Sequence, residues 1–320
     1  MDVSPERRRY EELKQQVHFH NHRYHVLDDP LISDLEYDRL VVELRQIEAA
    51  HPGWVTPDSP TQRSGAAPAD RFEKVRHPGR ILSLANAFGA GDARQWYERI
   101  SKLDDRVEKA AFVVEPKIDG LSVVLHYQDG IFTRGATRGD GEIGEDITAN
   151  LRTLKAIPLR IPVLPASSAS PQAGQPSLFD SSSSKIPFSN LPATLVVRGE
   201  AFITLKDFEA LNRTLEENGE KTYLNPRNTA AGSLRQLDPA VSASRPLTLL
   251  VYQVVHAAGG EVPATQWELL QWLKTLGFPV TAHARRFTGL DPAIAYMESW
   301  ENSRDQLGYE ADGMVIKLDD

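Results

Sequence analysis

The sequence predicts an α+β fold in which a small helical module precedes a larger domain with mixed or antiparallel sheets. Two segments near the N-terminus, 6–27 and 34–50, carry apolar residues at helical spacing. From residue 111 the pattern changes to short apolar and β-branched runs, which are typical of strands. The length of 320 residues also exceeds the usual span of one hydrophobic core, so two units are expected.

The two N-terminal helices are expected to form a hairpin closed by residues 28–30. Ser33 precedes the second helical pattern and Glu36 follows three residues later, which is the signature of a capping box. The next segment, TPDSPTQRSG, is rich in turn-forming residues and suits a hinge. The boundary is therefore placed near residues 55–70, between a module over 1–65 and a domain over 66–320.

The larger domain is expected to combine strands and helices. Its first strands lie within 111–138, around a hairpin turn at Asp129-Gly130. Residues 163–190 are rich in Ser and Pro and poor in large apolar groups, which predicts a mobile surface insertion. Further strands are expected at 194–203, 247–255 and 311–318, and helices at 92–107, 144–154, 204–218, 265–276 and 291–303.

Composition narrows the class of protein. The chain is 41% hydrophobic and 25% charged, as expected of a soluble globular protein. It lacks cysteine, which excludes disulfides, thiolate zinc sites and a cysteine nucleophile. The sequence shows neither a signal peptide nor an apolar run of about 20 residues, so a cytoplasmic location without membrane contact is expected. A net charge of −8 argues against a stand-alone nucleic-acid binder.

The central motif is EPKIDG, which places Lys117 at the end of an apolar strand and before a turn. A lysine is a nucleophile only as the neutral amine, which burial and nearby cations favour. Taken alone, KIDG favours an exposed hairpin turn with a solvated lysine over a nucleophile. The cations that could favour the neutral amine are Arg138, Arg198, Arg227, Arg304 and Lys317.

Four further motifs follow KIDG in order: ATRGDGEIGEDIT at 136–148, VRGEAF at 197–202, NPRNTAAGSLRQ at 225–236 and ADGMVIK at 311–317. In these five segments the chain closely resembles the NAD-dependent DNA ligases, a branch of the covalent nucleotidyltransferases. The segment YHVLDDPLISDLEYD at 24–38 is similar to that family's N-terminal module, which recognises the nicotinamide mononucleotide (NMN) half of NAD. The resemblance therefore implies a nucleotidyltransferase (adenylation) domain preceded by an NMN-recognition module.

The resemblance also implies the chemistry. Lys117 would attack the adenylyl phosphate of NAD, releasing NMN and leaving AMP on the lysine. Arg138 and Lys317 would stabilise the phosphate charge together with Mg²⁺, Asp119 would orient the leaving group or metal, and Asp312 is a candidate on the metal side. The residues expected to bind the cofactor are Tyr24, His25, Asp34, Tyr37 and Asp38 in the module, and Ser83, Leu84, Glu115 (adenine), Ile118, Gly120, Glu200 (ribose) and Arg304 in the larger domain.

Nicked duplex DNA is the implied partner, because in the full enzyme AMP passes to a 5′-phosphate and a 3′-hydroxyl then displaces it. Arg227 and Arg235 flank a segment of short side chains that permits close approach of a phosphate backbone. The chain stops before the family's oligonucleotide-binding, four-cysteine zinc, helix-hairpin-helix and BRCT domains. We therefore expect part of a longer, monomeric enzyme, with weak DNA binding here and Zn²⁺ only in that downstream region.

Several other hypotheses were weighed. Residues 139–144 fit G-x-G-x-x-G, but a Rossmann fold needs an acidic residue about 20 positions later, and 147–179 contain none. His18, His22 and His25 share a helical face and could suggest a metal, although the resemblance assigns His25 to NMN. An ATP- or GTP-using relative, which would lack the 24–38 segment, and a non-catalytic DNA-binding scaffold are the alternative functions. Ala85 stands where an acid is expected in many relatives, which leaves the role of that position open.

Overall fold

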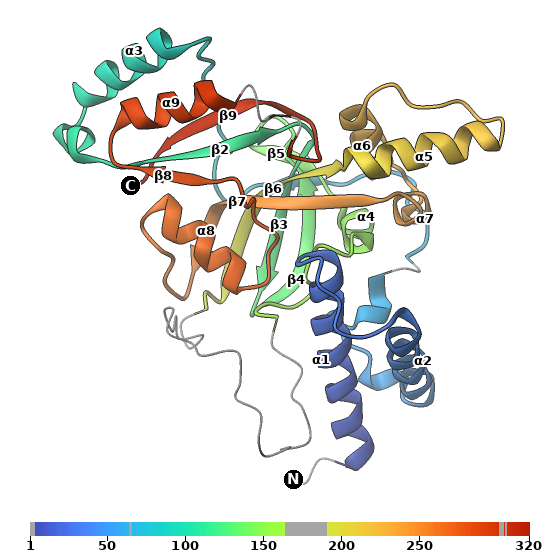
Figure 1. The fold of residues 1–320 in the computed structure, drawn as a ribbon. Helices are drawn as coiled ribbons and strands as arrows, with labels where there is room; N and C mark the ends of the chain where they lie inside the picture. The colour runs from blue at the N-terminus through green and yellow to red at the C-terminus, as the bar shows by residue number, and fades with distance from the viewer. Residues whose placement is uncertain (1–3, 64–65, 164–190, 301–303, 305) are drawn as a thin grey trace, which may run out of the picture.

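A computed structural model describes residues 4–63, 66–163, 191–300, 304 and 306–320. It has two parts, a helical module (blue in Figure 1) and a larger body that contains the sheets. Apart from residue 163, the insertion expected at 163–190 lies outside the described residues.

The module is the helical hairpin expected from the sequence, made of α1 (Pro5–His25) and α2 (Asp34–Ala50). The capping box of α2 is present, because Ser33 Oγ accepts from the Glu36 amide at 3.3 Å and the Ser33 amide donates to Glu36 Oε2 at 2.9 Å. Apolar side chains from both helices form its buried core: Tyr10, Leu13, Val17 and Leu44.

The body is built on two antiparallel sheets, which confirms the α+β class. The larger has the order β4 (Ile131–Thr137), β3 (Leu121–Gln128), β6 (Thr194–Ile203), β7 (Leu247–Ala258). The smaller has the order β8 (Arg285–Phe287), β2 (Phe112–Ile118), β9 (Ala311–Leu318). Asp129 and Gly130 both have positive φ, 49° and 74°, as the tight β3–β4 hairpin turn requires.

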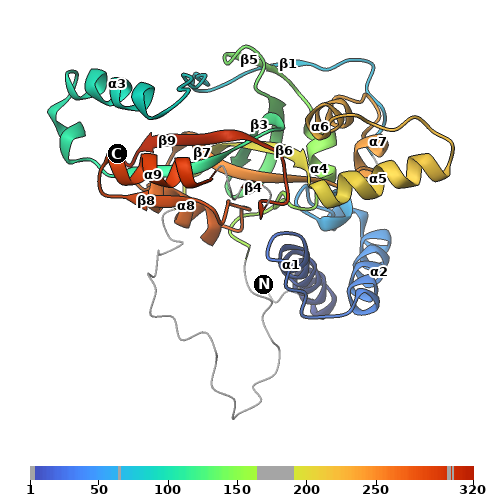
Figure 2. The same cartoon turned by 45° about the horizontal axis from the view of Figure 1, so that its top comes forward.

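Helices cover both sheets, and the layers are clearest in Figure 2. The main core packs the large sheet against α4 (Thr148–Thr153), α6 (Pro226–Leu234) and α8 (Gln266–Thr275). The small sheet packs against α3 (Ala90–Ser101) and α9 (Leu290–Trp300). The remaining helices are α5 (Leu205–Glu217) and α7 (Pro239–Ala243), with 3₁₀ turns at Pro52–Trp54, Pro60–Arg63 and Asp105–Lys109.

Two expectations about the helices were wrong. Residues 144–154 are not one helix, because β5 (Ile143–Glu145) pairs with β1 (Lys74–Arg76) and the helix begins only at Thr148. The helix expected at 92–107 ends at Ser101 and is followed by a 3₁₀ turn. The glycine motif at 139–144 therefore joins two strands, and every strand pair in the described residues is antiparallel, which rules out the Rossmann reading.

The connector after α2 is packed rather than irregular. The carboxylate of Asp58 is buried and bridges the two parts of the chain, because it lies 3.3 Å from Lys14 Nζ in α1 and 2.6 Å from Arg160 Nε in the body. Arg63 donates to the carbonyls of Leu154 and Ile157, both at 2.8 Å. Burial alone would raise the pKa of Asp58, but hydrogen bonds from Thr56 and Arg160 outweigh it and the pKa falls below its usual range.

Replacing Asp58 with Ala is expected to lower the free energy of unfolding by about 3 kcal/mol, because it leaves the buried Lys14 ammonium without its buried carboxylate and with only the partly exposed Glu11, 3.6 Å away. Unfolding in urea measures the loss. A double variant, Lys14→Met with Asp58→Leu, removes both buried charges and should recover most of the stability. An equal loss in the double variant would contradict the role given to the ion pair.

Within the described residues, no helix has the length and apolar character needed to span a membrane.

Candidate active site

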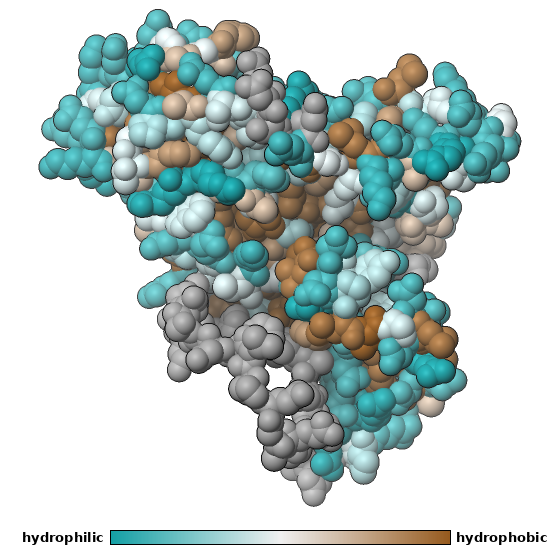
Figure 3. Space-filling view, in the orientation of Figure 1, coloured by the Kyte–Doolittle hydropathy of each residue, from teal (hydrophilic) through white to brown (hydrophobic). Residues whose placement is uncertain are grey.

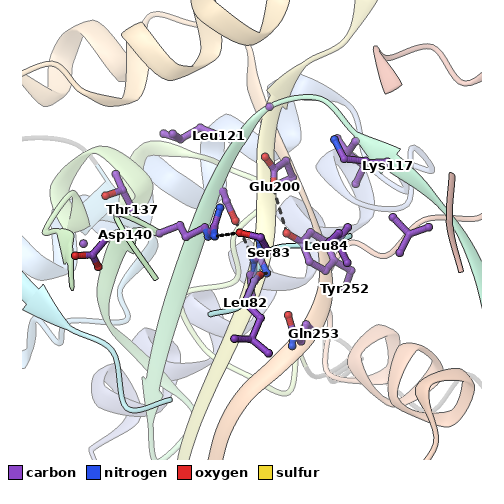
Figure 4. Close-up of a pocket in the computed structure, with 18 of the residues that line it drawn as sticks. Leu82, Ser83, Leu84, Lys117, Leu121, Thr137, Asp140, Glu200, Tyr252 and Gln253 are labelled. Carbon is purple, nitrogen blue, oxygen red and sulfur yellow. Dashed lines mark hydrogen bonds between the residues drawn. The ribbon is translucent and has the colours of Figure 1, made fainter. Parts of the chain in front are cut away.

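A cleft of about 1200 Å³ lies between the two sheets. Lys117 reaches it from β2 in the small sheet, and Glu200 and Tyr252 reach it from β6 and β7 in the large sheet (Figure 4). Most of the site residues expected in the larger domain line this cleft: Ser83, Leu84, Glu115, Lys117, Ile118, Gly120, Arg138, Glu200, Arg227, Arg235 and Lys317.

The backbone of β2 is irregular next to Lys117. The β2–β9 register shifts between Lys117 and Ile118, and Lys117 lies opposite Gly313. Just beyond, a side chain at Gly120 would place its Cβ 2.3 Å from the Ala201 carbonyl oxygen, so only glycine lets the turn pack against β6. The glycine of the EPKIDG motif is therefore required by the packing of the backbone.

The immediate neighbour of the Lys117 ammonium is an acid. Its Nζ pairs with the carboxylate of Asp312, at the start of β9. Arg227 Nη1 lies 3.9 Å from the same carboxylate and pairs with Asp119 at 2.6 Å. Asp312 therefore contacts Lys117 directly, whereas Asp119 is linked to this pair only through Arg227. Neither acid is among the residues that line the cleft.

The other cations of the site are held by partners around the cleft wall. Lys317 Nζ lies 2.8 Å from Glu115 Oε1, and Gln266 donates to the same oxygen at 2.8 Å. Arg138 donates to Ser83 Oγ at 2.7 Å, the contact dashed in Figure 4. Arg304 lies elsewhere: it is exposed, 3.6 Å from Glu310, and outside the cleft lining.

The cleft is cationic although the chain is acidic. Eight of its lining residues are Lys or Arg and four are Asp or Glu, giving 8 − 4 = +4, against −8 for the whole chain. A concave surface lined by one sign of charge concentrates ligands of the opposite sign. The cleft is therefore suited to a polyanionic ligand. Its basic lining residues are Lys74, Arg80, Lys117, Arg138, Arg198, Arg227, Arg235 and Lys317.

Glu200 has a perturbed pKa. Burial raises the pKa of its carboxyl to about 7, and the hydrogen bond from the Tyr252 hydroxyl, 3.1 Å from Oε2, opposes only part of that shift. Near neutral pH the ionised fraction of Glu200 therefore depends on pH, which affects any ligand hydroxyl that donates to it.

The raised pKa of Glu200 predicts a pH-dependent stability. The folded protein holds this proton more tightly than the unfolded chain, so the contribution of Glu200 to stability falls as pH rises from about 5 to 8. Glu200→Gln removes the titration, and its stability relative to the parent should rise by about 1–2 kcal/mol across that interval, allowing for partial exposure. Urea unfolding at both pH values tests this; a difference that does not change with pH would refute it.

A second, smaller pocket of about 280 Å³ lies at the module. It contains all five residues expected there to contact NMN: Tyr24, His25, Asp34, Tyr37 and Asp38. It shares no lining residue with the Lys117 cleft. The structure thus gathers the expected NMN contacts in one pocket and most of the other expected site residues in the cleft, and the two cavities are separate.

The histidines of α1 do not form a metal centre, because the described residues contain no group of three His, Cys, Asp or Glu side chains that could hold a metal ion. Burial lowers the pKa of His18 to about 3 and that of His25 to about 4. These imidazoles are accordingly neutral at physiological pH.

Sequence reasoning missed several residues of the cleft. Tyr252 lies beside Glu200, with Arg198 5.5 Å and Lys317 5.3 Å from its ring centre. Gln266, at the start of α8, donates a hydrogen bond to the Glu115 carboxylate. The Ser122 hydroxyl accepts a hydrogen bond from Arg198 Nε at 3.0 Å. In the sequence, Tyr252 lies in a predicted strand and Gln266 in a predicted helix. Neither residue belongs to a motif that indicates a functional site.

The fold and the cleft together define a nucleotidyltransferase-like domain with a helical N-terminal module. Comparison with known proteins makes this more specific. Residues 69–169 and 180–320 match the model of the NAD-dependent DNA ligase adenylation domain, and 4–65 match that of the DNA ligase-like, N-terminal NAD+-binding domain. The chain belongs to the NAD-dependent DNA ligase family.

Curated relatives agree. The chain is 52% identical to a DNA ligase of Roseiflexus sp. (strain RS-1) over 98% of this chain and 42% of that protein. It is 50% identical to a DNA ligase of Chloroflexus aggregans over 98% of this chain and 44% of that protein. Among solved structures it is similar to "mycobacterial DNA ligase D complexed with ATP and MES", with 15% identity, 66% of this chain and 50% of that chain covered, and a TM-score of 0.31. The chain thus spans less than half the length of the curated relatives.

Proposed function

We propose that this chain performs the first step of NAD-dependent DNA ligation, the transfer of AMP from NAD to Lys117. The proposal is carried by two observations: Lys117 lines a cationic cleft, and a separate pocket at the module contains all five expected NMN contacts. The first pocket suits the adenylyl part of the dinucleotide, and the second suits the nicotinamide part.

In this step the neutral amine of Lys117 forms a bond to the adenylyl phosphorus, and the bond from that phosphorus to the bridging oxygen breaks. The electron pair leaves with NMN, and the product is a lysine–AMP phosphoramidate. Asp312 is placed to accept the proton that the ammonium must lose, because it contacts Nζ directly. Arg227, 3.9 Å from Asp312, offsets the negative charge there.

The remaining residues bind and orient the nucleotide. Arg138 and Lys317 supply positive charge for the phosphate oxygens, where charge develops. Glu115 and Glu200 present carboxylates that accept hydrogen bonds from the adenine amino group and the ribose hydroxyls.

Mg²⁺ fits this site only as an ion shared with the substrate. The described residues offer no three-ligand group, and Mg²⁺ commonly uses one or two carboxylates together with phosphates and water. We assign Asp312 as the protein carboxylate that would contact the ion. When bound, the ion would neutralise charge on the phosphate oxygens.

Binding NAD across both pockets requires the module to move. The NMN pocket and the cleft do not share a wall here, so the module must close over the cleft for the transfer and withdraw afterwards. We place the hinge in the connector at 55–70, whose contacts through Asp58 and Arg63 would have to rearrange.

We further propose that the whole enzyme seals nicks in duplex DNA during replication and repair, acting as a cytoplasmic monomer. Arg227 and Arg235 are our candidates for DNA-phosphate contacts. Arg227 is tied to Asp119, and Arg235 lies 2.9 Å from Glu145, so DNA would have to replace these partners.

The decisive experiment is an intact-mass measurement after incubation with Mg²⁺ and either NAD or ATP. Addition of one AMP with NAD alone supports the proposal. Addition with ATP would instead favour an ATP-using nucleotidyltransferase, and no addition with either donor would refute self-adenylation by this chain. A non-catalytic DNA-binding scaffold would also give no addition, and is disfavoured by the charge of −8.

A further inference from the structure

One residue of the module pocket comes from the body. Lys155 lies in the turn after α4. In the part of the chain that the structure describes, it is the single lining residue of this pocket outside α1, α2 and the loop between them. The module reaches this turn through Asn21, a buried residue whose Nδ2 donates to the Lys155 carbonyl at 2.9 Å. The backbone of residue 155 therefore contacts the module. Burial, followed by the positive charge of Lys155, lowers the pKa of His25, which indicates that this charge lies close to the pocket.

The charges of the combined pocket match one kind of ligand. Asp34 and Asp38 supply two carboxylates, and among the described residues Lys155 supplies the only Lys or Arg charge of the lining. Tyr24, Tyr37 and His25 add aromatic faces. A ligand with a cationic aromatic ring and an anionic phosphate satisfies both groups of charges, and NMN has both, as a pyridinium ring joined through ribose to a phosphate.

The surface around this pocket is apolar. Leu31 and Leu35 are 58% and 62% exposed, and Figure 3 shows apolar side chains gathered where the module meets the body. Lys155 belongs to the body, so the docked arrangement of module and body offers a charged group that the module alone lacks.

We propose that Lys155 binds the phosphate of NMN when the module is docked on the body, so that NMN stabilises the arrangement in which the Lys117 cleft is uncovered. The inference rests on the proposed function, because it assumes that the module pocket takes NMN. A ligand stabilises whichever arrangement binds it more tightly. The released product would in this way keep the module away from the cleft after AMP transfer.

The test is the affinity of the chain for NMN, measured by calorimetry for the parent and for Lys155→Ala. The substitution keeps the carbonyl that Asn21 contacts, so the docked arrangement should survive. We expect about tenfold weaker NMN binding, as for the loss of one partly screened charge-assisted hydrogen bond, and recovery in Lys155→Arg. Lys206→Ala, which removes an exposed lysine of α5, is the matched control and should bind as the parent does.

Nicotinamide riboside, which keeps the cationic ring but lacks the phosphate, should bind the parent and Lys155→Ala equally. Equal NMN affinity in both proteins, or an equal loss for the riboside, would overturn the role of Lys155. AMP transfer from NAD is measured on the same preparations. Transfer by the parent together with unchanged NMN binding in Lys155→Ala refutes this inference alone, whereas a parent that accepts no AMP from NAD refutes the proposed function and the inference with it.

Discussion

Lys117→Ala should yield no AMP adduct after incubation with NAD and Mg²⁺. The alanine removes the atom that would bond to phosphorus. The other two lysines that line the cleft have partners of their own, because Lys317 lies 2.8 Å from Glu115 and Lys74 lies 3.4 Å from Glu145. Lys117→Arg should fail as well, because a guanidinium stays protonated and is not a nucleophile at neutral pH. Intact mass measures the adduct, and peptide mapping of the parent should place it on Lys117.

The matched control is again Lys206→Ala, which removes a lysine charge from the exposed face of α5 and should accept AMP at the parental rate. Far-ultraviolet circular dichroism would show whether the Lys117 variants keep their fold. An adduct that persists in folded Lys117→Ala would assign the nucleophile to another residue.

Local signals made much of the fold predictable. The capping box at Ser33 and Glu36 fixed the start of α2, and the Asp129-Gly130 turn fixed the β3–β4 hairpin. Segments rich in apolar and β-branched residues predicted β6 and β9 with the observed limits, because such residues favour strands. In each of these elements the residues that determine the structure are neighbours in sequence.

Elements formed by distant pairing escaped prediction. β1 and β5 are three residues each, too short to show a period, and they exist because Lys74 lies opposite Glu145, 71 positions away in the chain. Gly144 allows this pairing, since a Cβ there would lie 1.8 Å from the Thr137 carbonyl oxygen. Residues 143–145 therefore form a strand, because pairing with β1 prevents the expected helix from starting before Thr148.

The residues of the site also divide into those that sequence motifs predicted and those that depend on contacts between distant segments. Lys117, Glu200 and Lys317 were chosen through family motifs, and the fold gathers them in one cleft. Arg304 was proposed as a candidate cation outside these motifs and does not line the cleft, whereas Tyr252 lines the cleft although no motif includes it. Motifs identify residues that chemistry constrains; the side chains that support them are set by which strands meet, and a single sequence does not reveal this.

Asp38→Ala should slow AMP transfer from NAD on the order of 100-fold, equivalent to about 2.7 kcal/mol of lost transition-state stabilisation. Asp38 is an exposed residue of α2 that lines the module pocket, so its loss should remove an electrostatic contact to the nicotinamide half without disturbing the core. The rate of adduct formation at low NAD concentration gives the decrease. Gln46→Ala, at an exposed position later in the same helix, is the control and should leave the rate unchanged.

The reverse reaction makes this prediction more demanding. A chain that already carries AMP on Lys117 should return it to added NMN, and by microscopic reversibility the same contacts serve both directions. Asp38→Ala should therefore slow both transfers by a similar factor, because NMN is bound in the forward and reverse transition states alike. If the forward rate fell while the reverse rate did not, Asp38 would not bind the nicotinamide half, and the module would contribute to adenylation in some other way.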